Sequence, residues 1–152
     1  MSSTIDKTLT HVLFLARHIK NIDLPVKIML ILMELRMPTN RIGFELLKSA
    51  IQLKCENPTR VLSADIYREI ALQYSQISEE QVEQAIREEI KAAWKTGSEA
   101  AWSWYFSYDG VNPKRRPSNG EVISKLAYTT ALWQGCEKEV DRDEERYQDI
   151  LA

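Results

Sequence analysis

The spacing of apolar residues constrains the fold of this chain more than any other feature. In each patterned segment, apolar side chains recur every three or four positions, which places them on one face of a helix. Residues 4–20 show this spacing at Leu9, Val12, Leu13, Ala16 and Ile19. No segment alternates apolar and polar residues as a half-buried strand does. Because 152 residues can bury one core, the sequence predicts a compact, all-α, multi-helix domain.

Capping and helix-breaking residues set the expected limits of the other helices. Asp23 can cap a helix that has Pro25 in its first turn, where the missing N–H does no harm. Pro38 is expected to open the next helix after a tight break, and Ser118 or Asn119 to cap the last one. The expected helices cover about 24–36, 38–56, 63–74, 79–96 and 120–133, with a helical turn at 100–106 inside a structured loop.

Two of these helices form a helix-turn-helix pattern. Residues 63–74 and the helix from residue 79 are separated by a four-residue turn. Ser78, followed three residues later by Gln81, has the form of a capping box. Ala71 and Ala85 are expected to be buried where the helices touch, with Val82 and Ile86 seating the second helix on the first. By itself this pattern is equally typical of an ordinary helical hairpin.

Composition gives no sign of an unusual environment. The net charge is −2, so any affinity for phosphate must come from local clusters of basic residues. The two cysteines, Cys55 and Cys136, lack a CxxC spacing and fit a reducing compartment. The apolar stretch 24–37 is short and carries charges, and the N-terminus lacks the pattern of a secretion signal. We therefore expect a cytoplasmic protein with no membrane association.

Catalysis, metal binding and cofactor binding find no support in the sequence. There is no Ser/His/Asp arrangement, glycine-rich phosphate loop or HExxH motif. His11 and His18 could share a helix face, but no cysteine or carboxylate completes a ligand set. Trp102, Trp104 and Tyr105 could stack on the bases of a single strand, although such a cluster more often fills a core. We expect no catalytic residues, metal site or cofactor.

Three longer segments carry a family resemblance. They are residues 34–51 (ELRMPTNRIGFELLKSAI), residues 69–97 (EIALQYSQISEEQVEQAIREEIKAAWKTG) and residues 114–123 (KRRPSNGEVI). In order and spacing they resemble the C-terminal effector domain of the stage-zero sporulation response regulator of endospore-forming bacteria. The resemblance covers roughly residues 30–133. It implies an all-helical, winged-helix-like effector domain of a response regulator that binds DNA through a helix-turn-helix.

The resemblance also suggests how the chain is divided. Residues 1–22 would be an extra N-terminal helix, 23–134 the sporulation-regulator-like domain, and 135–152 an acidic C-terminal segment. The receiver domain that precedes the effector domain in this family is expected to be missing.

The site residues follow from the same resemblance, which implies that the second helix of the motif enters the major groove of double-stranded DNA. Gln81 and Gln84 stand where the family has arginines, and Glu88 stands where it has a histidine. Glutamine pairs bidentately with adenine, whereas arginine pairs with guanine, so the target sequence is expected to differ. The implied DNA-facing residues are Gln81, Glu83, Gln84, Arg87, Glu88 and Lys91, with Lys114, Arg115, Arg116 and Asn119 near the phosphates.

Two functions remain open at this point. The first is a sequence-specific DNA-binding regulator of transcription, acting as a homodimer through residues 4–20 or the acidic segment. The second is a protein-interaction module that keeps the fold, has lost DNA binding and pairs with a related full-length regulator. The region from Glu79 to Thr96 holds five acidic and three basic residues, which is unusual for a groove-binding helix and favours the second function.

Overall fold

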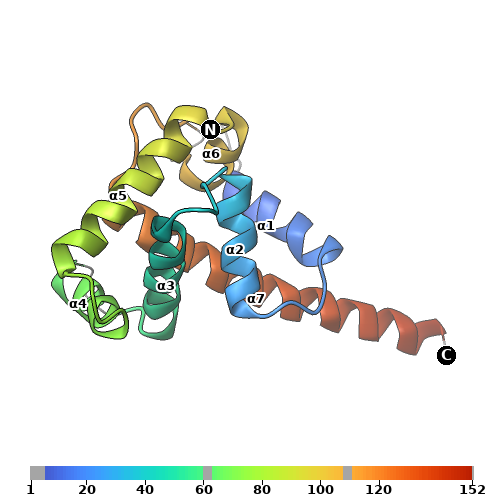
Figure 1. Cartoon of the computed structure of the whole chain (residues 1–152). Coiled ribbons are helices and arrows are strands. Elements are labelled where there is room, and N and C mark those ends of the chain that lie inside the picture. The colour runs from blue at the N-terminus through green and yellow to red at the C-terminus, as the bar shows by residue number, and fades with distance from the viewer. Residues whose placement is uncertain (1–5, 60–62, 108–110, 152) are drawn as a thin grey trace.

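The structure, a computed structural model, describes residues 6–59, 63–107 and 111–151. Every regular element in these ranges is a helix, which confirms the all-α fold (Figure 1). None of the helices described is both long and apolar enough to cross a membrane. The elements are α1 (Lys7–His18), α2 (Leu24–Glu34), α3 (Ile42–Glu56), α4 (Ser63–Gln73), α5 (Glu79–Thr96), α6 (Glu99–Phe106) and α7 (Asn119–Leu151).

Helix α7 organises the fold. It contacts α1, α2, α3, α5 and α6, whereas α4 packs on α3 and α5. The core lies where these helices meet, and its largest fully buried side chains include Tyr105, Phe106 and Trp133. In Figure 1 the C-terminal part of α7 continues past the other helices and ends away from the body of the molecule. Helices α4 and α5 lie at the opposite end in Figure 1, so the helix-turn-helix is far from the C-terminus.

The predicted cap of α2 is confirmed. The Asp23 carboxylate accepts a hydrogen bond of 3.1 Å from the backbone N–H of Val26, with Pro25 in the first turn. Helix α1 ends at His18 instead of residue 20, and the expected start at residue 4 lies outside the described residues. Asp6 caps α1 by accepting from the N–H of Leu9 at 3.0 Å.

The predicted start of α3 at Pro38 is wrong, because α3 begins at Ile42 with Arg41 as its N-cap. Helix α2 ends at Glu34, and Arg36, two residues later, adopts a left-handed backbone conformation with φ 61°. Hydrogen bonds of 3.0 Å from the N–H groups of Arg36 and Met37 to the carbonyls of Met33 and Leu32 close this end. The chain then needs several residues to reverse direction before a new helix can start.

The C-terminal part of the chain also differs from expectation. Helix α7 does not end near Trp133 but continues to Leu151, so the boundary expected at residue 134 falls inside one continuous helix. Gly135 does not stop it, although glycine costs about 1 kcal/mol in a helix relative to alanine. Ion pairs hold the next turns: buried Lys27 lies 3.1 Å from Glu137, and Lys20 lies 3.3 Å from Glu144.

The aromatic cluster belongs mainly to the core. The expected turn at 100–106 is a full helix, α6, capped by Ser98. Trp102 and Tyr105 are buried, and the half-buried Trp104 stacks on His11 of α1 with ring centroids 4.3 Å apart. Tyr105 donates a 2.7 Å hydrogen bond to Glu34, which also lies 2.7 Å from His11. These contacts favour core packing over base stacking for the cluster.

Candidate nucleic-acid interface

Helices α4 and α5 and the turn between them form the predicted helix-turn-helix. The capping box is complete: the N–H of Gln81 donates to Ser78 Oγ at 3.1 Å, and the N–H of Ser78 donates to Gln81 Oε1 at 2.8 Å. Val82 and Ile86 are fully buried, as expected. Ala71 and Ala85 are only half-buried, so the prediction that both are buried at the helix contact is wrong.

Helix α3 approaches α5 closely at Gly43. A Cβ atom on this glycine would lie 2.6 Å from the carbonyl oxygen of Ala85 and 3.0 Å from Cβ of Glu89. Only glycine permits the two backbones to come so near without displacement. Gly43 therefore fixes the position of α5 against the core, a role that the sequence analysis missed although the residue lies inside the first resembling segment.

Five of the predicted DNA-facing residues of α5 are exposed, namely Gln81, Gln84, Arg87, Glu88 and Lys91. Gln84 donates to Glu88 at 2.8 Å and accepts from Arg87 Nη1 at 2.7 Å. The side-chain oxygen of Gln81 is committed to the capping box. Bidentate pairing with adenine needs both the oxygen and the nitrogen of the amide. Gln84 would have to leave its contacts with two exposed side chains, whereas Gln81 would have to leave the backbone of the helix cap, so the contacts of Gln84 are the easier ones to exchange for a base.

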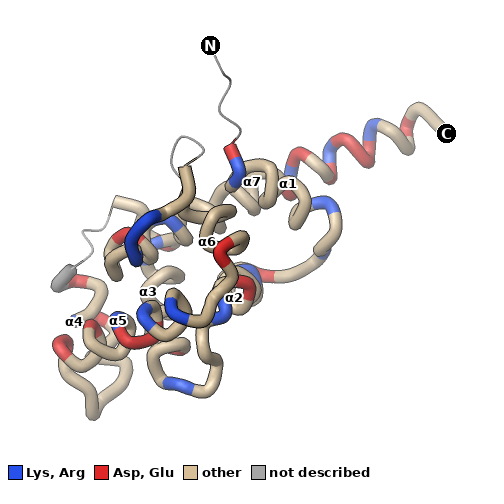
Figure 2. The backbone as a smooth tube through the Cα atoms, turned by 90° about the horizontal axis from the view of Figure 1, so that it is seen from above, with Lys and Arg blue, Asp and Glu red and all other residues tan. Residues whose placement is uncertain are grey.

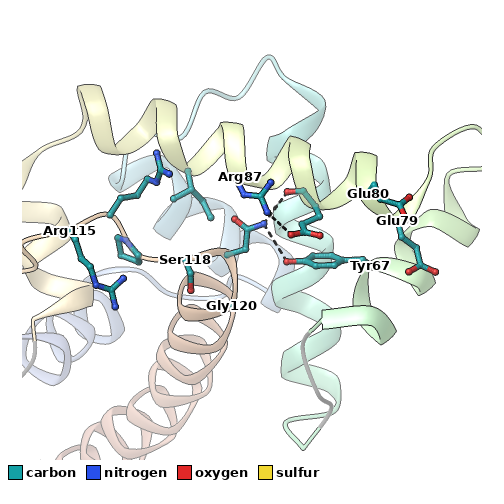
Figure 3. A pocket seen from close by; sticks show the side chains of 12 residues that line it. Tyr67, Glu79, Glu80, Arg87, Arg115, Ser118 and Gly120 are labelled. Atoms are coloured by element: carbon teal, nitrogen blue, oxygen red, sulfur yellow. Dashed lines mark hydrogen bonds and ion pairs between the residues drawn. The ribbon is translucent and has the colours of Figure 1, made fainter.

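A groove separates α5 from the segment that leads into α7 (Figure 3). Its walls come from α4, α5 and residues 115–120. The lining residues are Tyr67, Glu79, Glu80, Glu83, Arg87, Ile90, Arg115, Arg116, Pro117, Ser118, Asn119 and Gly120. The groove thus brings together Glu83, Arg87, Arg115, Arg116 and Asn119 from the predicted set. Lys114 is exposed nearby in sequence but does not line it.

Asn119 joins the three walls of the groove. Its side-chain Nδ2 donates to the backbone oxygen of Glu83 at 3.0 Å and to the hydroxyl of Tyr67 at 3.4 Å (Figure 3). Burial raises the pKa of Tyr67 above its usual 10, against the lowering effect of the Asn119 hydrogen bond. With its donor group committed to α4 and α5, Asn119 positions the segment 114–118 beside α5.

Two basic residues of the groove are held by carboxylates. Arg87 pairs with Glu83 one turn earlier in α5. Arg115 lies 3.1 Å from Glu121, which Ser118 also contacts as it caps the start of α7. All of these charged side chains keep substantial exposure. Such surface pairs add little stability, and they orient the guanidinium groups while leaving them accessible to an anion.

The acidic residues of α5 are less exposed than the sequence indicates. Glu79 pairs with Arg68 of α4 at 3.2 Å, and Glu83 pairs with Arg87. Glu89 is 1 % exposed, and neither of its carboxylate oxygens has a hydrogen-bond partner among the described residues. Burial raises the pKa of Glu89 to about 7, with Arg41 opposing this effect. Glu80 and Glu88 remain as the exposed acids of α5 for which the described residues provide no ion pair.

A comparison with family models matches residues 28–130 to the model described as "Sporulation initiation factor Spo0A C terminal". The match includes α3, α4, α5 and α6 in full, together with most of α2 and the first part of α7. The helix-turn-helix and the groove beside it therefore lie within the matched residues, whereas α1 and the C-terminal part of α7 lie outside them.

Proposed function

Since the chain belongs to the family of the sporulation initiation factor Spo0A C-terminal domain, we propose that it is a sequence-specific DNA-binding regulator of transcription in sporulation. The family consists of sporulation-related DNA-binding effector domains. Helix α5 would enter the major groove, with its exposed face toward the bases. A regulator of chromosomal genes acts in the cytoplasm, and we propose that this protein does so as a homodimer.

The observation that carries this proposal is the placement of the basic segment 114–116 beside α5. Arg115 and Arg116 line the same groove as Arg87, and Asn119 ties that groove to the backbone of α5. Phosphate contacts position a protein on the duplex, whereas contacts to base edges supply specificity. We assign the first role to Arg115, Arg116 and Lys114, and the second to Gln84, with Lys91 further along the same exposed face of α5.

The ion pairing and burial of the acidic residues of α5 support DNA binding over the function of a protein-interaction module. From the sequence, α5 has two more acids than bases, which would repel phosphates. Glu79 and Glu83 are engaged with arginines, and Glu89 lies inside the protein. The face offered to a duplex is therefore close to neutral, and Arg115 and Arg116 beside it supply the attraction.

Selection of binding sites from random duplexes tests the assignment of Gln84. The parent should enrich a common sequence, and Gln84→Ala should lose preference at one base pair while keeping its affinity for random DNA. The matched control is Gln81→Ala, whose side-chain oxygen serves the capping box; it should lower stability and leave the preferred sequence unchanged. Equal enrichment of all sequences by the parent would contradict sequence-specific binding.

A protein-interaction module remains the second candidate, because Glu80 and Glu88 are exposed on α5 and the end of α7 is acidic. Such a module would bind a basic partner, for example a related full-length regulator. Glu88→Gln separates the two functions. In a DNA-binding protein this change should raise affinity for random duplex, most strongly at low salt. In an interaction module it should weaken the protein complex, with no DNA binding by either form.

A further inference from the structure

The outward face of α7 is exposed along most of a helix about 50 Å long. Its side chains contact neighbours in α7 itself: Lys125 Nζ lies 5.4 Å from the ring centroid of Tyr128, and Arg142 Nη1 lies 3.5 Å from Glu139 Oε1. Residues spaced alternately by three and four positions lie on this face: Tyr128, Ala131, Gly135, Lys138, Arg142, Glu145 and Asp149. All of them are exposed, and we call them the α7 seam. Tyr128 leaves 60 % of its surface exposed, which is unusual for an aromatic residue in the middle of a well-packed helix.

The centre of the α7 seam is open to close approach by another helix. A Cβ atom on Gly135 would meet nothing within 4 Å, so the protein itself does not require a glycine there. Glycine costs about 1 kcal/mol in a helix relative to alanine, and this cost has no compensation inside the protomer. Ala131, one turn earlier, is also small and exposed. Small residues at the crossing point permit two helices to pack at short distance.

The two ends of α7 carry opposite charge. The segment that leads into α7 is basic at Lys114, Arg115 and Arg116, and Lys125 follows in the second turn. The other end, from Glu137 to Asp149, holds seven acidic and three basic residues. Figure 2 shows the basic run as a continuous blue segment on the body, and red predominating along the projecting end of the helix. These charges attract when two copies of α7 lie antiparallel.

We propose that two copies of this chain pair through the α7 seam, antiparallel and crossing at Gly135. Residues equally distant from Gly135 then face each other. Tyr128 of one copy meets Arg142 of the other, a cation–π contact that forms twice. The acidic end of each helix lies beside the basic segment 114–116 of its partner. This arrangement is two-fold symmetric and closed, as in most soluble dimers.

One like-charge pair accompanies this arrangement. Asp149 faces the region of Glu121 in the partner helix. Within its own protomer Glu121 already pairs with Arg115 at 3.1 Å, so the incoming Asp149 meets an arginine–carboxylate pair beside Arg116 and Lys114 instead of an isolated carboxylate. The net charge at this end of the contact therefore favours association, and raised salt should weaken it.

We propose a second copy of this chain as the partner, and not a different basic protein, because the two ends of α7 are complementary in charge. Each copy carries the acidic end, the basic segment and the small residues at the centre, so this surface is self-complementary. Much of the α7 seam lies beyond residues 28–130, the part that matches the family. The pairing does not depend on DNA binding, so it can be measured on the protein alone.

Sedimentation equilibrium of the full chain, without DNA, tests the proposal. The parent should form dimers over the micromolar range at low salt and dissociate at high salt. Gly135→Arg should weaken the dimer by about tenfold or more, since it fills the crossing point without a clash inside the protomer. Ala100→Arg, which adds the same side chain at an exposed position of α6, is the matched control and should dimerise like the parent.

A charge exchange supplies the second arm of the test. Glu145→Lys with Asp149→Lys, and separately Arg115→Glu with Arg116→Glu, should each weaken self-association. An equimolar mixture of the two variants should restore a heterodimer, because each acidic surface then finds a basic one. A monomeric parent throughout the range, dimerisation of Gly135→Arg equal to that of the parent, or a mixture that stays monomeric would overturn the proposal.

Discussion

Asn119 in the first turn of α7 donates a 3.0 Å hydrogen bond to the backbone carbonyl of Glu83, near the N-terminal end of α5. A side chain from the segment after the basic run thus holds the helix expected to enter the major groove. The contact determines how far Arg115 and Arg116 lie from the exposed face of α5. It makes the phosphate-binding and base-reading parts of the proposed interface one rigid unit.

Replacing Asn119 should loosen this unit. Asn119→Ala removes the bonds to Glu83 and Tyr67 and should cost about 1–2 kcal/mol of stability, measured by urea unfolding. Affinity for random duplex should fall although no charge has changed. Asn119→Asp keeps the shape but places an acceptor against a carbonyl oxygen, so it should be at least as harmful. Full DNA affinity in both variants would show that the hydrogen bond does not position the basic segment.

Glu89 should make stability depend on pH. Its pKa rises from 4.5 to about 7 on folding, so the folded protein binds this proton more tightly than the unfolded chain. The stability associated with the protonated form is complete below pH 4.5 and is lost as pH rises through 7. A shift of this size corresponds to about 3 kcal/mol.

Glu89→Gln should remove this dependence, because the amide is neutral at every pH. The variant should be more stable than the parent at pH 8 and similar to it at pH 5, as measured by urea unfolding at both values. The control is Glu88→Gln, an exposed neighbour, which should not change the difference between the two pH values. An unfolding free energy of Glu89→Gln that is below that of the parent at pH 8 would contradict the assignment.

Alanine substitutions at Gly43 in α3 and at Gly135 in α7 test the packing of α5, because only the first glycine lies against that helix. Gly43→Ala places a Cβ atom 2.6 Å from the carbonyl oxygen of Ala85 and should cost about 1–3 kcal/mol through the shift it forces. Gly135→Ala meets nothing within 4 Å and should stabilise the chain by up to about 1 kcal/mol. Thermal or urea unfolding measures both. Equal effects of the two changes would mean that α3 does not restrain α5.

Local signals predicted the helix-turn-helix well because they act within a few residues. Ser78 and Gln81 form the cap that their spacing indicates, and Val82 and Ile86 are buried as the helical period requires. Packing between helices that are distant in the sequence leaves no local signal of this kind. Glu89 was counted among the five acidic residues of 79–96 that would face DNA or a partner, yet the approach of α3 at Gly43 covers it.

The C-terminal end of the chain was harder to predict, again because contacts with residues distant in sequence decide its structure. The composition becomes acidic after residue 135, which suggested a separate segment, but Lys27 of α2 and Lys20 just after α1 hold it as part of α7. Among the site residues, Asn119 is hydrogen-bonded to α4 and α5, and its expected place near the phosphates stays a prediction. That Gln84, Lys91 and the basic segment contact DNA stays a prediction.

Titration of random-sequence duplex with the parent and with Arg115→Ala, Arg116→Ala at several salt concentrations tests the central claim most directly. The parent should bind at low salt, with an affinity that falls steeply as salt increases. The double variant should bind more weakly to all sequences, with a salt dependence reduced by about two phosphate contacts. Failure of the parent to bind micromolar duplex at low salt, with the fold intact, would contradict the claim that this protein is a DNA-binding regulator.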